Sequence, residues 1–92
     1  MKTINDLILA TDEIVNHITD FSLHENALSI ASQILSNVDY ETYELKLRQI
    51  KHYIHLSVFV SYNSVFLCQE YADLAKNEAK RLKHFVNTIT IH

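Results

Sequence analysis

The chain of 92 residues contains neither glycine nor proline. Tight β-hairpin turns depend on residues that adopt positive φ, above all glycine, so this absence argues against a β-rich fold. Helices need neither residue in their interiors, and both residues weaken or interrupt a helix. The sequence therefore predicts an all-α protein with a single helical domain over residues 1–92.

Apolar residues at helical spacing divide the chain into segments that are separated by short polar breaks. Thr3 with Asp6 predicts the start of the first helix, whose pattern continues to about residue 19. Ser22 with Glu25 matches the S-x-x-E capping box and predicts the start of the second helix. Asp39 is the predicted N-cap of the third helix. The three breaks are TDFS (19–22), SNVD (36–39) and SYNS (61–64).

The stretch HLSVFVSYNSVFLC (55–68) decides the number of helices. It lies within an inner stripe spaced by four and three residues, which is typical of helices and not of strands. If SYNS is a turn, the protein is a small antiparallel bundle of four helices. If SYNS is helical, the bundle has three helices, one of them long and C-terminal. The stripe comprises Ile54, Val58, Ser61, Val65, Cys68, Ala72, Ala75, Ala79, Leu82, Val86 and Ile89.

Residues 52–69 carry no charge, which raises the question of a membrane span. Polar side chains interrupt the run and no flanking charges anchor it, so we interpret it as buried helix and expect no membrane association. The lone Cys68 cannot form an internal disulfide, and the N-terminal segment lacks the apolar core of a signal peptide. These features predict a cytoplasmic protein, in the host cytoplasm if the gene is carried by a phage.

No group of residues in the sequence predicts catalysis. His52 and His55 are three residues apart on a helix, but no pattern supplies the further ligands that a metal site needs. Cys68 lies on the inner stripe, where a cysteine behaves as a small apolar residue. Phosphate-binding loops and nucleophile elbows both require glycine. We therefore expect no enzymatic activity, no metal and no cofactor.

Charges of opposite sign are concentrated in the two halves of the chain. Residues 1–45 contain eight acidic residues and one basic residue, whereas residues 46–92 contain seven basic and three acidic residues. Such rows are often plain solvated faces, but an acidic row can also guide a protein target to its site. The predicted partner-binding acidic face is Asp6, Glu13, His17 and Asp20. The basic row, a possible face for an anion or a nucleic acid, is Lys76, Lys80, Arg81 and Lys83.

The functional hypothesis combines small size, the absence of a catalytic group and the acidic face. Residues with AT-rich codons (Phe, Tyr, Met, Ile, Asn and Lys) number 33, against 8 for Gly, Ala, Arg and Pro. We interpret the protein as a non-enzymatic protein-binding module, a stoichiometric inhibitor of the phage anti-defence, host-takeover or toxin-immunity type. One alternative is a nucleic-acid-associated regulator that uses the basic row. Another is a helical oligomer that sequesters a small anionic ligand.

Residues 54–75 offer more apolar surface than a single stripe can bury inside one small chain. Large contiguous apolar patches rarely stay exposed on soluble monomers, so the sequence predicts a homodimer. The predicted oligomer interface is Leu56, Val60, Leu67, Tyr71 and Leu74.

Overall fold

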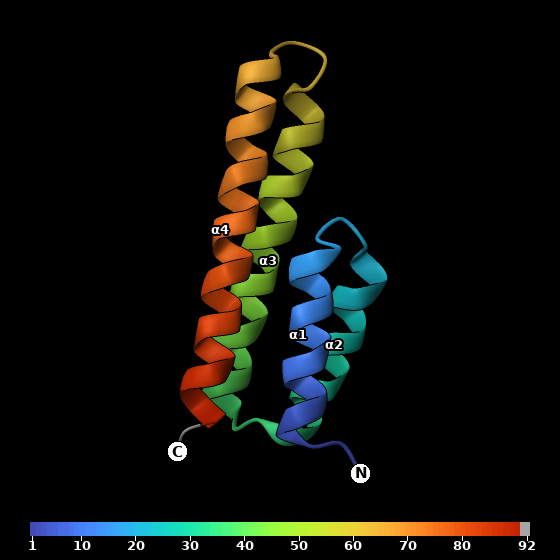
Figure 1. Ribbon diagram of the computed structural model, residues 1–92, viewed down its shortest axis with the longest axis vertical. Coiled ribbons are helices and arrows are strands. Elements are labelled where there is room, and N and C mark those ends of the chain that lie inside the picture. The colour runs from blue at the N-terminus through green and yellow to red at the C-terminus, as the bar shows by residue number, and fades with distance from the viewer. Residues whose placement is uncertain (91–92) are drawn as a thin grey trace.

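The computed structural model describes residues 1–90, and all regular secondary structure in that range is helical (Figure 1). The all-α prediction is thereby confirmed. SYNS (61–64) forms a turn between the last two helices, so the alternative with four helices is the correct one. The helices are α1 (Ile4–Asn16), α2 (Phe21–Ile34), α3 (Asn37–Val60) and α4 (Val65–Thr90).

The helix starts agree with the sequence prediction at α1 and differ from it at α2 and α3. At α1, the Asp6 carboxylate accepts a hydrogen bond from the Thr3 backbone N–H at 2.7 Å. The N-cap of α2 is Asp20 and not Ser22, because the Asp20 carboxylate accepts from the Ser22 backbone N–H at 3.1 Å. In the same way Ser36, and not Asp39, caps α3. In both cases the side chain of an earlier polar residue accepts a hydrogen bond from a backbone N–H of the first turn. The helix therefore begins before the N-cap residue that the sequence predicts.

Neighbouring helices run antiparallel, and α1 packs against both α2 and α4 while α3 packs against α2 and α4 (Figure 1). The helices differ greatly in length: α1 and α2 have 13 and 14 residues, whereas α3 and α4 have 24 and 26. Ten additional residues extend a helix by about 15 Å. The α3–α4 hairpin therefore rises above the α1–α2 turn, and the molecule measures 45 × 22 × 21 Å.

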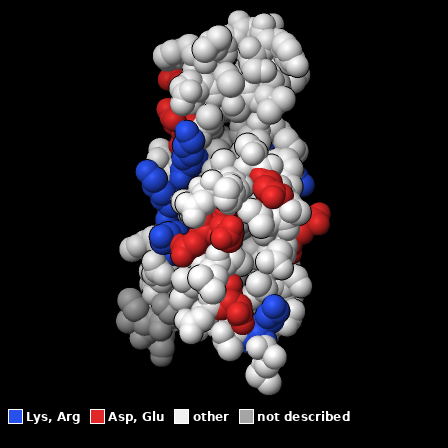
Figure 2. Space-filling model, turned by 45° about the vertical axis from the view of Figure 1, so that its right-hand side comes forward, with Lys and Arg blue, Asp and Glu red and all other residues white. Residues whose placement is uncertain are grey.

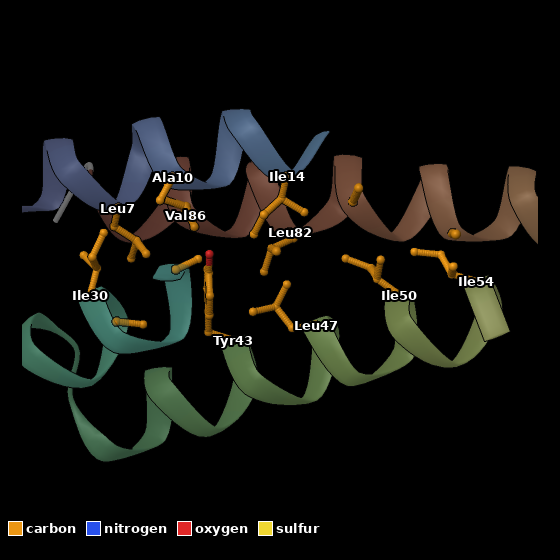
Figure 3. Close-up of a cluster of buried hydrophobic side chains, with 14 residues drawn as sticks. Leu7, Ala10, Ile14, Ile30, Tyr43, Leu47, Ile50, Ile54, Leu82 and Val86 are labelled. Atoms are coloured by element: carbon orange, nitrogen blue, oxygen red, sulfur yellow. The ribbon is translucent and has the colours of Figure 1, made fainter. Parts of the chain in front are cut away.

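The hydrophobic core fills only the part of the molecule where four helices surround it (Figure 3). On α3 the core extends no further than Ile54, and on α4 it begins at Ala75. The buried apolar residues are Leu7, Ala10, Ile14, Ala27, Ile30, Ala31, Tyr43, Leu47, Ile50, Ile54, Ala75, Ala79, Leu82 and Val86.

A polar contact inside the core joins α1 to α3. The Thr11 hydroxyl donates to the Leu7 carbonyl at 2.7 Å, so the Tyr43 hydroxyl is the donor in the 2.9 Å bond between Thr11 and Tyr43. Both side chains are fully buried. Burial disfavours the phenolate and raises the pKa of Tyr43 to about 12, although the bond to Thr11 acts in the opposite direction.

Alkaline pH is expected to destabilise the protein through Tyr43. Its pKa in the folded state is about 12, against an ordinary value of 10.0, so the unfolded state loses this proton first. The resulting stability is complete below pH 10 and falls as pH rises toward 12. The expected loss is about 1.4 kcal/mol at pH 11, measured by urea unfolding. Tyr43→Phe is the control, and an equal loss in that variant would contradict the assignment to Tyr43.

Small residues form the seam of α4, as the sequence predicts. Ala75 and Ala79 are both buried, and leucine at either position is expected to overpack the core. Each substitution should lower the free energy of unfolding by roughly 1–3 kcal/mol. Lys80→Gln, on the exposed side of the same helix, should change it by no more than about 0.5 kcal/mol. Equal effects of Ala79→Leu and Lys80→Gln in urea unfolding would show that the inner face is assigned wrongly.

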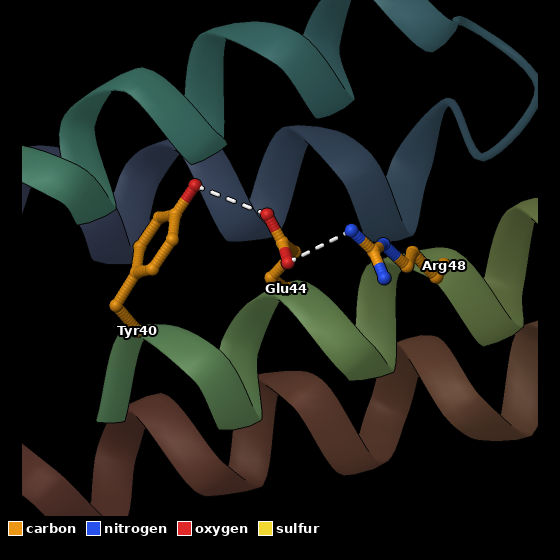
Figure 4. A network of polar contacts seen from close by, with 3 residues as sticks. All are labelled: Tyr40, Glu44 and Arg48. Atoms are coloured by element: carbon orange, nitrogen blue, oxygen red, sulfur yellow. Dashed lines mark hydrogen bonds and ion pairs between the residues drawn. The ribbon is translucent and has the colours of Figure 1, made fainter. Parts of the chain in front are cut away.

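Phe21 and His24 connect the start of α2 to the preceding turn and to α3. His24 donates from Nε2 to the Ile18 carbonyl at 3.0 Å, and burial lowers the pKa of its imidazole. The Phe21 ring meets the rings of both His24 and His55 edge to face. Within α3 itself, Glu44 accepts from the Tyr40 hydroxyl and pairs with Arg48 at 3.1 Å, so this network links successive turns of one helix (Figure 4). The ring contact between Phe21 and His55 therefore places the start of α2 against the last two turns of α3.

Candidate binding surface at the hairpin end

The α3–α4 hairpin ends in a group of exposed apolar side chains. We call residues 55–69 the hairpin end; they extend beyond the core residues Ile54 and Ala75. Exposed apolar residues occur on both helices and in the turn between them. The most exposed are Val58 (60%), Phe59 (75%), Tyr62 (92%), Val65 (83%) and Phe66 (70%), with Leu67 less so.

Two geometric causes expose these side chains. Phe59 is nine residues after the buried Ile50, and Phe66 is nine before the buried Ala75, so at about 100° per residue both point away from the core. Val58 and Val65, in contrast, continue the inner stripe. The prediction that they are buried is wrong, and Cys68 and Ala72 are only half-buried, because α1 and α2 are too short to cover this part of the hairpin.

The exposed apolar area of the hairpin end is comparable with the largest apolar patch on a typical monomer, which is often functional. An aromatic side chain has about 150–250 Å² to bury, so Phe59, Tyr62 and Phe66 together expose roughly 350–600 Å². The largest apolar patch on a typical monomer covers about 300–600 Å², and here the aliphatic residues add to the aromatic ones. The hairpin end therefore has the area of an interaction site.

The hairpin end also lacks charge and unpaired buried hydroxyl groups. No charged residue occurs between Lys51 and Glu70, and Figure 2 shows neither blue nor red surface at this end of the visible face. Inside the hairpin the Ser57 hydroxyl donates to the Cys68 carbonyl at 2.9 Å. The Ser64 hydroxyl accepts from the Leu67 backbone N–H at 3.1 Å. Such a surface fits an apolar partner.

Two apolar hollows lie where the hairpin end meets the α1–α2 turn. One is on the α2 flank, between Phe21 and Phe59, and includes the edge of His55. The other lies between α3 and α4, directly next to the α1–α2 turn, and has a volume of about 180 Å³. The lining of this second hollow, which we call the turn hollow, includes Ile18, Thr19, Ser57, Val58 and Ala72.

The oligomer interface predicted from the sequence coincides with only part of the exposed apolar surface. Leu56, Val60 and Tyr71 are half-buried within the chain, whereas Leu67 and Leu74 are exposed. The predicted interface lacks three strongly exposed aromatic residues of the hairpin end, Phe59, Tyr62 and Phe66. The signal that could have revealed them is the position of three aromatic residues outside the inner stripe of an uncharged run.

The structure gives two residues of the predicted acidic face a role in helix capping. Asp6 accepts from the Thr3 backbone, and that bond contributes most to the lowered pKa of its carboxyl group. Asp20 accepts from both the hydroxyl and the N–H of Ser22, and the hydroxyl contributes most to its lowered pKa. Glu13 and His17 are exposed on α1 and just after it. Helix capping therefore explains half of the acidic row.

The predicted basic row is partly neutralised by acidic residues of the same chain. Lys83 pairs with Asp12 across the α1–α4 contact at 3.2 Å, and Arg81 pairs with the nearly buried Glu78 at 2.7 Å. Lys76 and Lys80 are exposed. An open hollow brings Lys80 and Arg81 together with Lys46, His84, Phe85 and Thr88. A nucleic-acid site needs more cations on one face than this row supplies.

Residues 1–90 were compared with the requirements of two other kinds of site, a metal site and a membrane span, and meet neither. Within that range no three histidine, cysteine or acidic side chains lie close enough together to hold a metal ion. None of the four helices has a stretch long and apolar enough to cross a membrane. Comparison with protein-family models, curated proteins and solved structures finds no match to this chain, so function is inferred from its own residues.

Proposed function

We propose that the protein is a non-enzymatic protein-binding module that uses the hairpin end to form a stoichiometric complex with its target. The observation that carries this proposal is the uncharged, apolar end of the α3–α4 hairpin, which extends beyond the core. Aromatic residues are enriched and charged residues depleted at the centres of protein interfaces. Phe59 and Phe66, on the sides of the helices that face away from the core, are the proposed anchors.

The chemistry of the hairpin end favours a protein over a nucleic acid or a lipid bilayer. Nucleic acids are bound through lysine and arginine, and residues 52–69 contain neither. Insertion into a bilayer would place the polar turn of Ser61, Asn63 and Ser64 and two helix ends in hydrocarbon. Backbone groups that lack partners there cost several kcal/mol each. An apolar cleft in a folded protein has neither disadvantage.

The narrower type that we propose is a stoichiometric inhibitor of the anti-defence, host-takeover or toxin-immunity class. Small size suits a protein that acts by occupying its target. The AT-rich residue composition is consistent with a phage or plasmid origin. Exposed acidic residues such as Glu13 would increase the rate of encounter with a basic target.

Affinity capture from the cells in which the protein is made tests this proposal. The wild-type chain and a Val38→Ser control should retain the same target in equimolar amount, since Val38 is 73% exposed but lies at the opposite end of α3. The double variant Phe59→Ser, Phe66→Ser should lose that target. Equal retention by the double variant would contradict the proposal, as would loss that occurs only when Glu13 and His17 are replaced.

A further inference from the structure

The hairpin end carries both a projecting side chain and a hollow that can receive one. Tyr62, at the tip of the hairpin, is the most exposed aromatic residue of those described. The turn hollow, beside Thr19, lies at the base of the same projection. A twofold interface requires both complementary parts on one molecule, because each residue of the pair is used twice.

We propose that a second copy of this chain binds the hairpin end antiparallel, with Tyr62 of each copy in the turn hollow of the other. The inference rests on the proposed function to the extent that it uses the same uncharged hairpin end. The inferred dimer contact uses a different side of the hairpin end, the side that lies beyond the α1–α2 turn. On this side Val58 and Val65 continue the inner stripe. Phe59 and Phe66 point away from the core and stay exposed for another protein.

The lengths of the helices suit this pairing. The projecting part of the hairpin is about 15 Å long, from the ten residues by which α3 exceeds α2. When two such projections overlap antiparallel, each tip lies at the base of the other projection. Four helices then surround Val58 and Val65 of both copies, as α1 and α2 surround the core lower in the molecule.

The turn hollow has the size and chemistry for an aromatic ring. The hollow is open on one side and has a volume of about 180 Å³, and an enclosed cavity of about 150 Å³ lined by Leu, Ile and Phe holds benzene. Ile18, Val58 and Ala72 contribute to a mostly apolar lining, to which Lys76 adds a charged side chain. Residues 52–69 have no charge, so the two copies bring no like charges from this segment into contact.

The available area predicts a dimer of modest affinity. Specific interfaces bury at least about 1,200 Å² in total, or about 600 Å² from each copy. One tyrosine contributes roughly 150–250 Å² of that area, and Val58, Val65 and the facing helix turns must supply the remainder. The dimer is therefore expected to dissociate on dilution, so the mass of the protein in solution should depend on its concentration.

Disulfide trapping between two single-cysteine variants tests the proposed contact. In a Cys68→Ala background, Tyr62→Cys and Thr19→Cys are purified separately, mixed and oxidised mildly. The mixture should form a heterodimeric disulfide, since a disulfide requires Cα atoms within about 7 Å. Neither variant alone should crosslink, because the two tips are about 15 Å apart along the bundle. Failure of the mixture to crosslink overturns the proposal, as does efficient crosslinking of Tyr62→Cys alone.

Light scattering after gel filtration provides a second measurement that does not depend on cysteine chemistry. The wild-type protein should exceed 10.7 kDa increasingly as its concentration rises through the micromolar range. Val65→Glu should remain helical and monomeric, whereas Phe66→Glu should still dimerise. A species of 10.7 kDa at every concentration would overturn the dimer and leave the proposed target binding by Phe59 and Phe66 untouched.

Discussion

Replacing Tyr43 with alanine is expected to lower the free energy of unfolding by about 3–5 kcal/mol. Tyr43 is fully buried between α1 and α3, and its hydroxyl donates to Thr11 (Figure 3). Its loss leaves a cavity at the centre of the core. Domains of this size have about 5–15 kcal/mol of stability, so this loss is a large share of the total free energy of unfolding.

Tyr62→Ala is the matched control for the effect of Tyr43→Ala. The residue type and the substitution are the same, but Tyr62 is almost completely exposed in the turn after α3. Its replacement should change the free energy of unfolding of the monomer by no more than about 0.5 kcal/mol. Circular dichroism during urea unfolding, at concentrations below those of association, measures both variants. Equal losses would contradict the position of the core.

Replacing Phe59 and Phe66 with serine is expected to weaken target binding by at least ~30-fold for each residue. Truncation of a central aromatic anchor typically costs 2 kcal/mol or more of binding free energy. The same substitutions should leave the free energy of unfolding within about 0.5 kcal/mol, because neither ring contributes to the core. Titration calorimetry with the captured target measures the affinity, and Val38→Ser provides the control.

An effect of these phenylalanine substitutions on folding would have a different meaning. If Phe59→Ser and Phe66→Ser destabilised the chain by several kcal/mol, the two rings would be part of the packing of the hairpin. The loss of target binding would then follow from unfolding and not from the loss of two anchors. Unfolding and binding therefore have to be measured on the same protein samples.

Much of the fold could be predicted from the sequence because local patterns determine it. The absence of glycine and proline predicts helices, whereas the sequence leaves open whether SYNS is a turn, and the structure shows that it is one. The inner positions Tyr43, Leu47 and Ile50 follow from their spacing. The exact helix starts were missed at Asp20 and Ser36, since periodicity says nothing about which polar side chain reaches the first free amides.

The binding surface could be predicted only in part, for a reason that lies in the lengths of the helices. Periodicity shows which side of a helix faces its neighbours, but not how far those neighbours extend. Val58 and Val65 follow the inner stripe and are nevertheless exposed, because α1 and α2 end below them. The excess of apolar surface in residues 54–75 was predicted. The three exposed aromatic residues of the hairpin end were not assigned to it.

Photo-crosslinking in living cells determines whether the hairpin end contacts a target protein. A photoreactive phenylalanine analogue is introduced at Phe66, or at Val38 as an equally exposed apolar control on another part of the surface. Irradiation should produce a defined adduct with one protein other than this chain from position 66 and none from position 38. Absence of such an adduct from position 66, or adducts of equal yield from both positions, would contradict the proposal that the hairpin end is the binding surface.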